Sequence, residues 1–148
     1  MQEDYINITL ADDDEDDRLF FTDAFDEIKI TTRVKTFNDG VYLMDYLNSD
    51  DATLPNVLFL DLNMPRKSGL ECLKEIKQNT KFKDIAIAIY STSASEEDIE
   101  NTFIQGANIY IKKPSDFKTL KKVLSEVVTI NWQYHTNSMN KDNFLLRF

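Results

Sequence analysis

The sequence contains few residues of the kinds that cross-link a chain or interrupt its secondary structure. Among its 148 residues are one cysteine, three glycines and three prolines. The single cysteine, Cys72, excludes an internal disulfide and a cysteine-based zinc site. Because 42% of the residues are hydrophobic, so little glycine and proline is typical of one globular domain and not of a disordered chain.

Long hydrophobic runs are also missing. No apolar stretch approaches the roughly 20 residues that a membrane-spanning helix needs. The acidic N-terminus lacks the basic start of a signal peptide. We therefore expect a cytoplasmic protein that has no membrane partner.

Positive charge is scarce, since the formal net charge is −9. Binding to a phosphate backbone needs a surplus of Lys and Arg on one face, so we expect no nucleic-acid partner. Residues 1–51 hold fifteen acidic side chains against four basic ones. Such an asymmetry is most often a solvated surface, but it can also attract a divalent cation or a basic partner.

Hydrophobic periodicity predicts strands and helices in alternation. The strands are expected at residues 5–11, 32–37, 56–62, 84–91 and 108–114. The helices are expected at residues 15–28, 41–47, 68–77, 95–105 and 117–128. Five strand–helix units in series predict a single α/β domain, with a five-stranded doubly wound parallel sheet flanked by five helices.

The regular pattern ends near Asn131, so we expect the folded domain to span residues 1–131. Residues 132–148 are polar and rich in asparagine, and they end in the apolar string FLLRF. This tail has three interpretations: an extension of the last helix, a flexible segment, or a segment that docks on this or another subunit.

Polar side chains follow the predicted strands. Asp12 and Asp13 end the first strand, Asp61 the third, Ser91 the fourth and Lys113 the fifth. In an open α/β sheet, ligands bind at the carboxyl ends of the strands, so these groups are expected to meet at one edge. A few carboxylates without histidine or thiol favour a hard cation and suit Mg²⁺ better than a closed Ca²⁺ cage.

These residues resemble the receiver domain of bacterial two-component response regulators. The resemblance rests, in chain order, on Asp12-Asp13, the string LDLNMP around Asp61, Ser91 in STSASEED, and YIKKP with Lys113. It extends to about residue 131. Its layout is most similar to single-domain members, the chemotaxis regulators and the short regulators partnered with phytochrome kinases. The resemblance implies a flavodoxin-like receiver fold.

The resemblance also implies a phospho-acceptor and a metal site. Asp61 would take a phosphoryl group from a histidine kinase or a histidine phosphotransfer protein. Asp13 and Asp61 would bind Mg²⁺ directly, with Asp12 acting largely through water and the Asn63 backbone carbonyl as a third protein ligand.

Three further residues would respond to the phosphoryl group. Lys113 would form an ion pair with it, Ser91 would donate a hydrogen bond to it, and Tyr110 would turn inward as Ser91 moves. The output would be a changed surface at residues 95–128, used by a downstream protein partner or by a homodimer. In this family Asn63 and Ser93 occupy positions that tune the lifetime of the acyl phosphate.

Other interpretations are weaker. The acidic run alone could be a solvated helix start, or an EF-hand loop, but Asp17 stands where that loop requires glycine. An aspartyl-phosphate phosphohydrolase would carry an acid/base Asp two residues after the nucleophile, where this chain has Asn63. A receiver-like scaffold that acts without phosphorylation stays open, because an intact site need not be used.

Overall fold

The computed structural model describes residues 5–129 and 145–146, and its strands form one parallel sheet. The strands are β1 (Ile6–Ala11), β2 (Thr32–Phe37), β3 (Val57–Leu60), β4 (Ala86–Ser91), β5 (Ile109–Lys112) and β6 (Leu145–Leu146). Their order is β2-β1-β3-β4-β5-β6. The first five strands follow the 2-1-3-4-5 order of flavodoxin-like doubly wound sheets, which confirms the predicted fold class.

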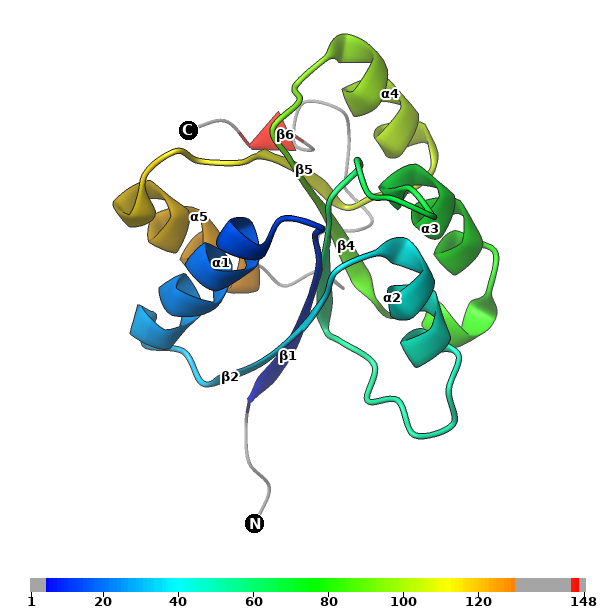
Figure 1. Cartoon of the computed structure of the whole chain (residues 1–148), viewed down its shortest axis with the longest axis horizontal. Helices are drawn as coiled ribbons and strands as arrows, with labels where there is room; N and C mark the ends of the chain where they lie inside the picture. Colours follow the sequence, from blue (N-terminus) through cyan, green and yellow to red (C-terminus); the bar gives the residue numbers. More distant parts are fainter. Residues whose placement is uncertain (1–4, 130–144, 147–148) are drawn as a thin grey trace.

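Five α-helices connect these strands, as predicted, and lie on the two faces of the sheet (Figure 1). They are α1 (Glu15–Glu27), α2 (Gly40–Leu47), α3 (Gly69–Lys77), α4 (Glu96–Ile104) and α5 (Phe117–Thr129). A short 3₁₀ helix, η1 (Thr80–Phe82), was not predicted. Three residues are too few to produce a periodic pattern.

The hydrophobic core has two halves, one on each face of the sheet. On one face α1 and α5 pack through Phe21, Phe25 and Leu124 against Phe59 of β3. On the other face α2, α3 and α4 contribute residues such as Leu43, Leu73 and Ile99. The central strands β3 and β4 are buried along their whole length, which explains their continuous apolar runs.

Side-chain caps fix where the helices begin. Asp14 caps α1, Asp39 caps α2 and Ser95 caps α4, each by accepting a hydrogen bond from a backbone N–H of the first turn. Ser68 and Glu71 form a capping box at α3. Because these caps stand directly after strand-end loops, they hold the loops that carry the candidate site.

The tail contributes a sixth strand, which periodicity did not predict because it has only two residues. β6 pairs in parallel with β5, with Leu145 opposite Tyr110 and Leu146 opposite Ile111. Two interpretations of residues 132–148, a helix extension and a flexible segment, concern residues 132–144 and 147–148, which lie outside the described residues. Within residues 5–129, no helix is long and apolar enough to cross a bilayer.

Candidate functional site: an acidic cluster beside a lysine

The sheet brings the predicted polar residues to one edge. Asp12 and Asp61 directly follow the neighbouring strands β1 and β3, and the Asp61 N–H donates to the Ala11 carbonyl at 3.0 Å. Ser91 is the last residue of β4, and its carbonyl accepts a hydrogen bond from the Lys113 N–H at 2.8 Å. The backbone pairing of parallel strands therefore sets the spacing of these side chains.

Three carboxylates converge at this edge. One oxygen from each of Asp12, Asp13 and Asp61 lies within 4.8 Å of the others. Asp12 is fully buried and Asp61 is 5% exposed, whereas Asp13 is exposed. Two buried carboxylates with an exposed third form a cluster that is open to solvent on one side, which fits a hard divalent cation that keeps part of its water shell.

The buried oxygen Asp12 Oδ2 supports the fit to a cation. It lies 2.8 Å from Lys113 Nζ, close enough for an ion pair. The arrangement is nevertheless outside hydrogen-bond geometry, and the oxygen has no hydrogen-bond partner within the part of the chain that the structure describes. Because a buried carboxylate oxygen is costly to leave without one, a second positive charge here would be favourable.

The ammonium group of Lys113 places a positive charge beside these carboxylates. Its Nζ lies 2.8 Å from Asp12 Oδ2, 2.8 Å from Asp17 Oδ2 and 3.3 Å from Asp61 Oδ2. Burial acts to lower the pKa of Lys113, but the adjacent carboxylates of Asp12 and Asp17 outweigh it and raise the pKa above its usual range. Lys113 is therefore a fixed positive charge at any pH at which the protein functions.

The pKa of Asp61 is raised, whereas the pKa of an aspartate beside a lysine is ordinarily lowered. Burial raises its pKa to about 6, against an ordinary value of 3.8. Lys113 opposes this increase and Asp12 adds to it. Without a divalent cation, ionised Asp61 is thus a source of instability in the folded state.

This shift predicts a pH-dependent stability difference. Because the folded-state pKa is raised, the proton on Asp61 stabilises the fold below about pH 4, and that contribution is lost as the pH rises through about 6. In EDTA we expect Asp61→Asn to unfold with a free energy roughly 2 kcal/mol higher than wild type near neutral pH, and no higher near pH 4. Urea unfolding at both pH values measures this, with exposed Asp84→Asn as control. A difference that does not change with pH would contradict it.

The β3–α3 loop holds Asp61 closely. Any side chain at Gly69 would overlap the backbone oxygen of Asp61, so only glycine allows α3 to begin this near the acceptor. The Asn63 N–H donates to Asp61 Oδ1 at 3.3 Å. Arg66 adopts a positive φ of 69° in the same loop, and its guanidinium lies 3.3 Å from Asp39 at the start of α2. The loop is thus anchored at both ends.

Ser91 and Tyr110 are linked through the β4–α4 loop. Ser91 Oγ accepts from the Ser93 N–H at 3.2 Å, and the Tyr110 hydroxyl donates to the Ser93 carbonyl at 2.7 Å. Ser93 Oγ in turn donates to Asp98 Oδ2 at 2.8 Å, within α4. The Tyr110 side chain is fully buried in this structure, so the inward orientation is the one observed.

Sequence reasoning missed one residue of this site. Asp17 was assigned only to the start of a helix, yet its carboxylate contacts Lys113. A signal for this was available: Asp17 precedes the buried residues Phe21 and Ala24 by four and seven positions, so it shares the buried face of α1. A carboxylate in the first turn of that face must point toward the strand ends.

Comparison with known proteins decides the family. The family model described as the response regulator receiver domain matches residues 8–125. This chain belongs to the response regulator receiver family. The probable methanogenesis regulatory protein FilR2 of Methanothrix harundinacea (strain 6Ac) is 30% identical over 128 residues, which cover 84% of this receiver chain and 83% of that protein.

Solved receiver structures agree. The phosphorylated cyanobacterial phytochrome response regulator RcpA superposes with a TM-score of 0.78 at 30% identity, covering 84% of this chain and 91% of that chain. The Mn²⁺-bound form of response regulator Rcp1 gives a TM-score of 0.76 at 29% identity, covering 84% and 93%. The receiver chain described here is thus homologous to single-domain response regulators of two-component signalling.

Proposed function

We propose that this chain is a Mg²⁺-dependent phospho-acceptor switch, in which Asp61 receives a phosphoryl group from a histidine kinase or a histidine phosphotransfer protein. The observation that carries the proposal is the convergence of Asp12, Asp13 and Asp61 within 4.8 Å, directly beside the Lys113 ammonium. Membership of the receiver family supports it. So does the Mn²⁺-bound relative, because Mn²⁺ and Mg²⁺ favour similar oxygen ligands.

In the proposed transfer, a carboxylate oxygen of Asp61 attacks the phosphorus of a phosphohistidine. A P–O bond forms, the P–N bond breaks, and the nitrogen leaves with the bonding pair, giving an acyl phosphate. The group must be ionised to attack, which the raised pKa of Asp61 permits above about pH 6. Mg²⁺ held by Asp13, Asp61 and the Asn63 carbonyl, with Asp12 acting through water, would neutralise charge on the transferring oxygens.

The residues around Asp61 would then respond to the new charge. Phosphorylation adds roughly −1.5 to −2 charge units at this point, and Lys113 can pair with it as a compact cation. Ser91 can donate its hydroxyl proton to a phosphoryl oxygen, which would change the loop bonded to Ser93 and Tyr110. Through that loop the signal would reach residues 95–128, which include α4, β5 and α5.

The proposed output is a contact with a downstream protein, with a homodimer through residues 95–128 as the alternative. Two-state arithmetic sets the scale: a shift from 1:99 to 99:1 requires the phosphoryl group to favour the active state by roughly 5.5 kcal/mol. Slow hydrolysis of the acyl phosphate would reset the switch, so turnover of an external substrate is not part of the proposal. A cytoplasmic location stays a prediction.

A substitution at Tyr110 separates signalling from phosphorylation. We expect Tyr110→Ala to weaken the response of residues 95–128 and still accept phosphate, because the Tyr110 hydroxyl donates a hydrogen bond to the β4–α4 loop at the Ser93 carbonyl. The readout is the shift of backbone amide resonances on adding beryllofluoride with Mg²⁺. Since Tyr110 is fully buried, Tyr110→Phe is the companion variant that keeps the core filled and loses only the hydroxyl. Loss of phosphorylation in folded Tyr110→Phe would contradict the assignment.

Two other functions are less favoured. A phosphohydrolase would need an acid/base group two residues after Asp61, but the Asn63 amide there cannot act as a general acid or base at neutral pH. A scaffold that never accepts phosphate gives no reason to keep three acids and a lysine together, since they cost stability without a ligand.

Incubation with acetyl phosphate tests the proposal. With Mg²⁺, the intact-protein mass should increase by one phosphoryl group, and EDTA should prevent the increase. A folded protein that binds Mg²⁺ but gains no mass, from acetyl phosphate and from a histidine-phosphorylated donor alike, would overturn it.

A further inference from the structure

The ammonium of Lys113 is shared by carboxylates from three elements, and one of them is not at a strand end. Lys113 Nζ lies 2.8 Å from Asp17 Oδ2, which is nearer than its 3.3 Å distance to Asp61 Oδ2. Asp17 belongs to the first turn of α1, and it stands outside the Asp12, Asp13 and Asp61 cluster.

The structure fixes Asp17 in this position from several sides. Its N–H donates to Asp14 Oδ1 at 3.1 Å, which holds it in the first turn of α1. The next residue, Arg18, donates from its guanidinium to the Asp12 carbonyl at 2.8 Å and ties that turn to the end of β1. Phe21 and Ala24 anchor the same helix face in the core. The first turn of α1 is therefore held beside Lys113, and it keeps the 36% exposed side chain of Asp17 within reach of the ammonium.

We propose that Asp17 is a positioning residue that competes with the phosphoryl group on Asp61 for the ammonium of Lys113. The proposal rests on the function proposed above. The Lys113 ammonium donates hydrogen bonds to Asp17 and Asp61 and forms an ion pair with Asp12, so three carboxylates share its positive charge. A divalent cation held by the Asp12, Asp13 and Asp61 cluster would offset the negative charge of Asp12, so Asp17 would remain as the competitor for Lys113.

The competition sets how strongly the phosphorylated state is favoured. While Asp17 holds Lys113, a phosphoryl group gains less from the ammonium, and the unphosphorylated arrangement is stabilised. Removing the Asp17 charge releases Lys113 toward Asp61. The first turn of α1 thereby regulates the acceptor without touching it.

The test measures the affinity of the protein for beryllofluoride, a mimic of the phosphoryl group, at saturating Mg²⁺. We expect Asp17→Asn to bind it about three- to tenfold more tightly than wild type, the range of one partly exposed ion pair. Asp16→Asn is the matched control: it removes the same charge from the same turn, but Asp16 is exposed and makes no ion pair with Lys113 in the described part of the chain. Its affinity should change less than twofold, an estimate for a screened surface charge.

A second comparison separates competition from a general charge effect. Asp17→Asn and Asp16→Asn should lower the Mg²⁺ affinity to a similar extent, because each removes one negative charge near the cluster. In a Lys113→Gln background, the gain produced by Asp17→Asn should vanish, as a double-mutant cycle requires for a direct pair. Asp17→Glu, which keeps the charge, should remain near wild type.

The outcomes distinguish the two proposals. Tighter binding in Asp17→Asn than in Asp16→Asn, lost in the Lys113→Gln background, supports the role of Asp17. Equal or weaker binding in Asp17→Asn overturns that role and leaves the proposed function intact. Wild-type protein that binds Mg²⁺ but neither binds beryllofluoride nor gains a phosphoryl group overturns both.

Discussion

Asp61→Asn is expected to lower the rate of phosphorylation by at least about a thousandfold. An amide oxygen is a far weaker nucleophile than a carboxylate and cannot form an acyl phosphate. The substitution preserves the shape of a side chain that is 5% exposed and held by the Asn63 N–H. The measurement is the rate of label transfer from a histidine-phosphorylated donor in Mg²⁺.

Asp84→Asn is the matched control for this loss. Asp84 is exposed and precedes β4, so it lies at the opposite end of that strand from Ser91. The same chemical change there should leave the rate within about twofold, as expected for a surface substitution. Transfer that persists in Asp61→Asn at more than a tenth of the wild-type rate would mean that another residue accepts the group.

Removal of the Lys113 charge is expected to lower the stability of the fold strongly. In EDTA, Lys113→Ala should lower the free energy of unfolding by about 3 kcal/mol, because it leaves the buried carboxylates of Asp12 and Asp61 facing each other without a cation. Mg²⁺ should restore much of this loss, since it brings a positive charge to the same carboxylates. Urea unfolding with and without Mg²⁺ measures both changes.

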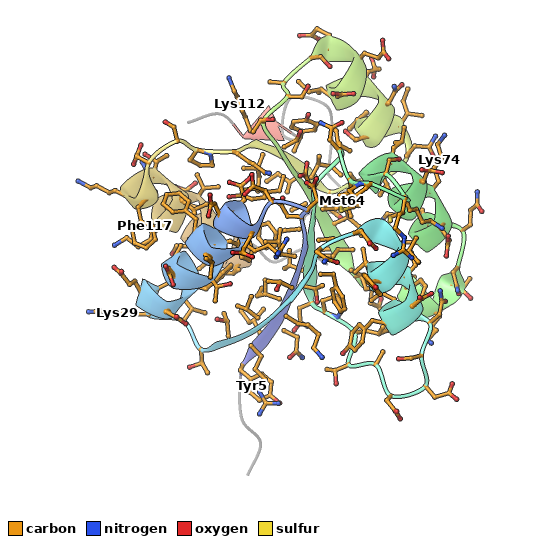
Figure 2. All side chains as sticks on the ribbon, viewed as in Figure 1. Tyr5, Lys29, Met64, Lys74, Lys112 and Phe117 are labelled. Atoms are coloured by element: carbon orange, nitrogen blue, oxygen red, sulfur yellow. The ribbon has the colours of Figure 1, made fainter. Side chains whose placement is uncertain are left out.

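The neighbouring lysine provides the comparison. Lys112 has the same chemistry but is exposed and points away from the protein body (Figure 2). Lys112→Ala should change the stability by less than about 0.5 kcal/mol and leave the Mg²⁺ dependence unaltered. Lys113→Arg keeps the charge, and its folding would show that the loss in Lys113→Ala is electrostatic. Similar stabilities for the two alanine variants in EDTA would contradict this assignment of Lys113.

Much of the fold follows from the sequence because its signals are local. The continuous apolar run VLFL predicts β3, and Ser68 with Glu71 predicts the start of α3 from side-chain chemistry alone. These features depend on residues a few positions apart. Parallel pairing then follows from the alternation of strands and helices.

Other features needed the three-dimensional arrangement. β6 has two residues and exists through its pairing with β5, so no local pattern could mark it. The pair between Asp17 and Lys113 joins residues 96 positions apart. The rings of Phe20 and Phe117 are in contact, with 5.3 Å between their centroids. This contact likewise depends on α5 lying beside α1, and Figure 2 labels Phe117 at that position. Long-range contacts of this kind are set by packing and not by periodicity.

The site shows the same division. Strand-end positions predicted that Asp12, Asp61 and Lys113 would meet, because parallel strands end at one edge. Their burial, and with it the raised pKa of Asp61, could not be read from the sequence, since it depends on how the loops cover the edge. The meeting of these residues was thus predictable, while their energetics were not.

The identity of the modified residue tests the central claim most directly. Borohydride reduces an aspartyl phosphate to homoserine, so the protein is phosphorylated by acetyl phosphate with Mg²⁺, reduced, digested and mapped by tandem mass spectrometry. The account predicts homoserine at position 61, absent when EDTA replaces Mg²⁺. Homoserine at position 12 or 13, or a stably phosphorylated protein without homoserine at position 61, would contradict it.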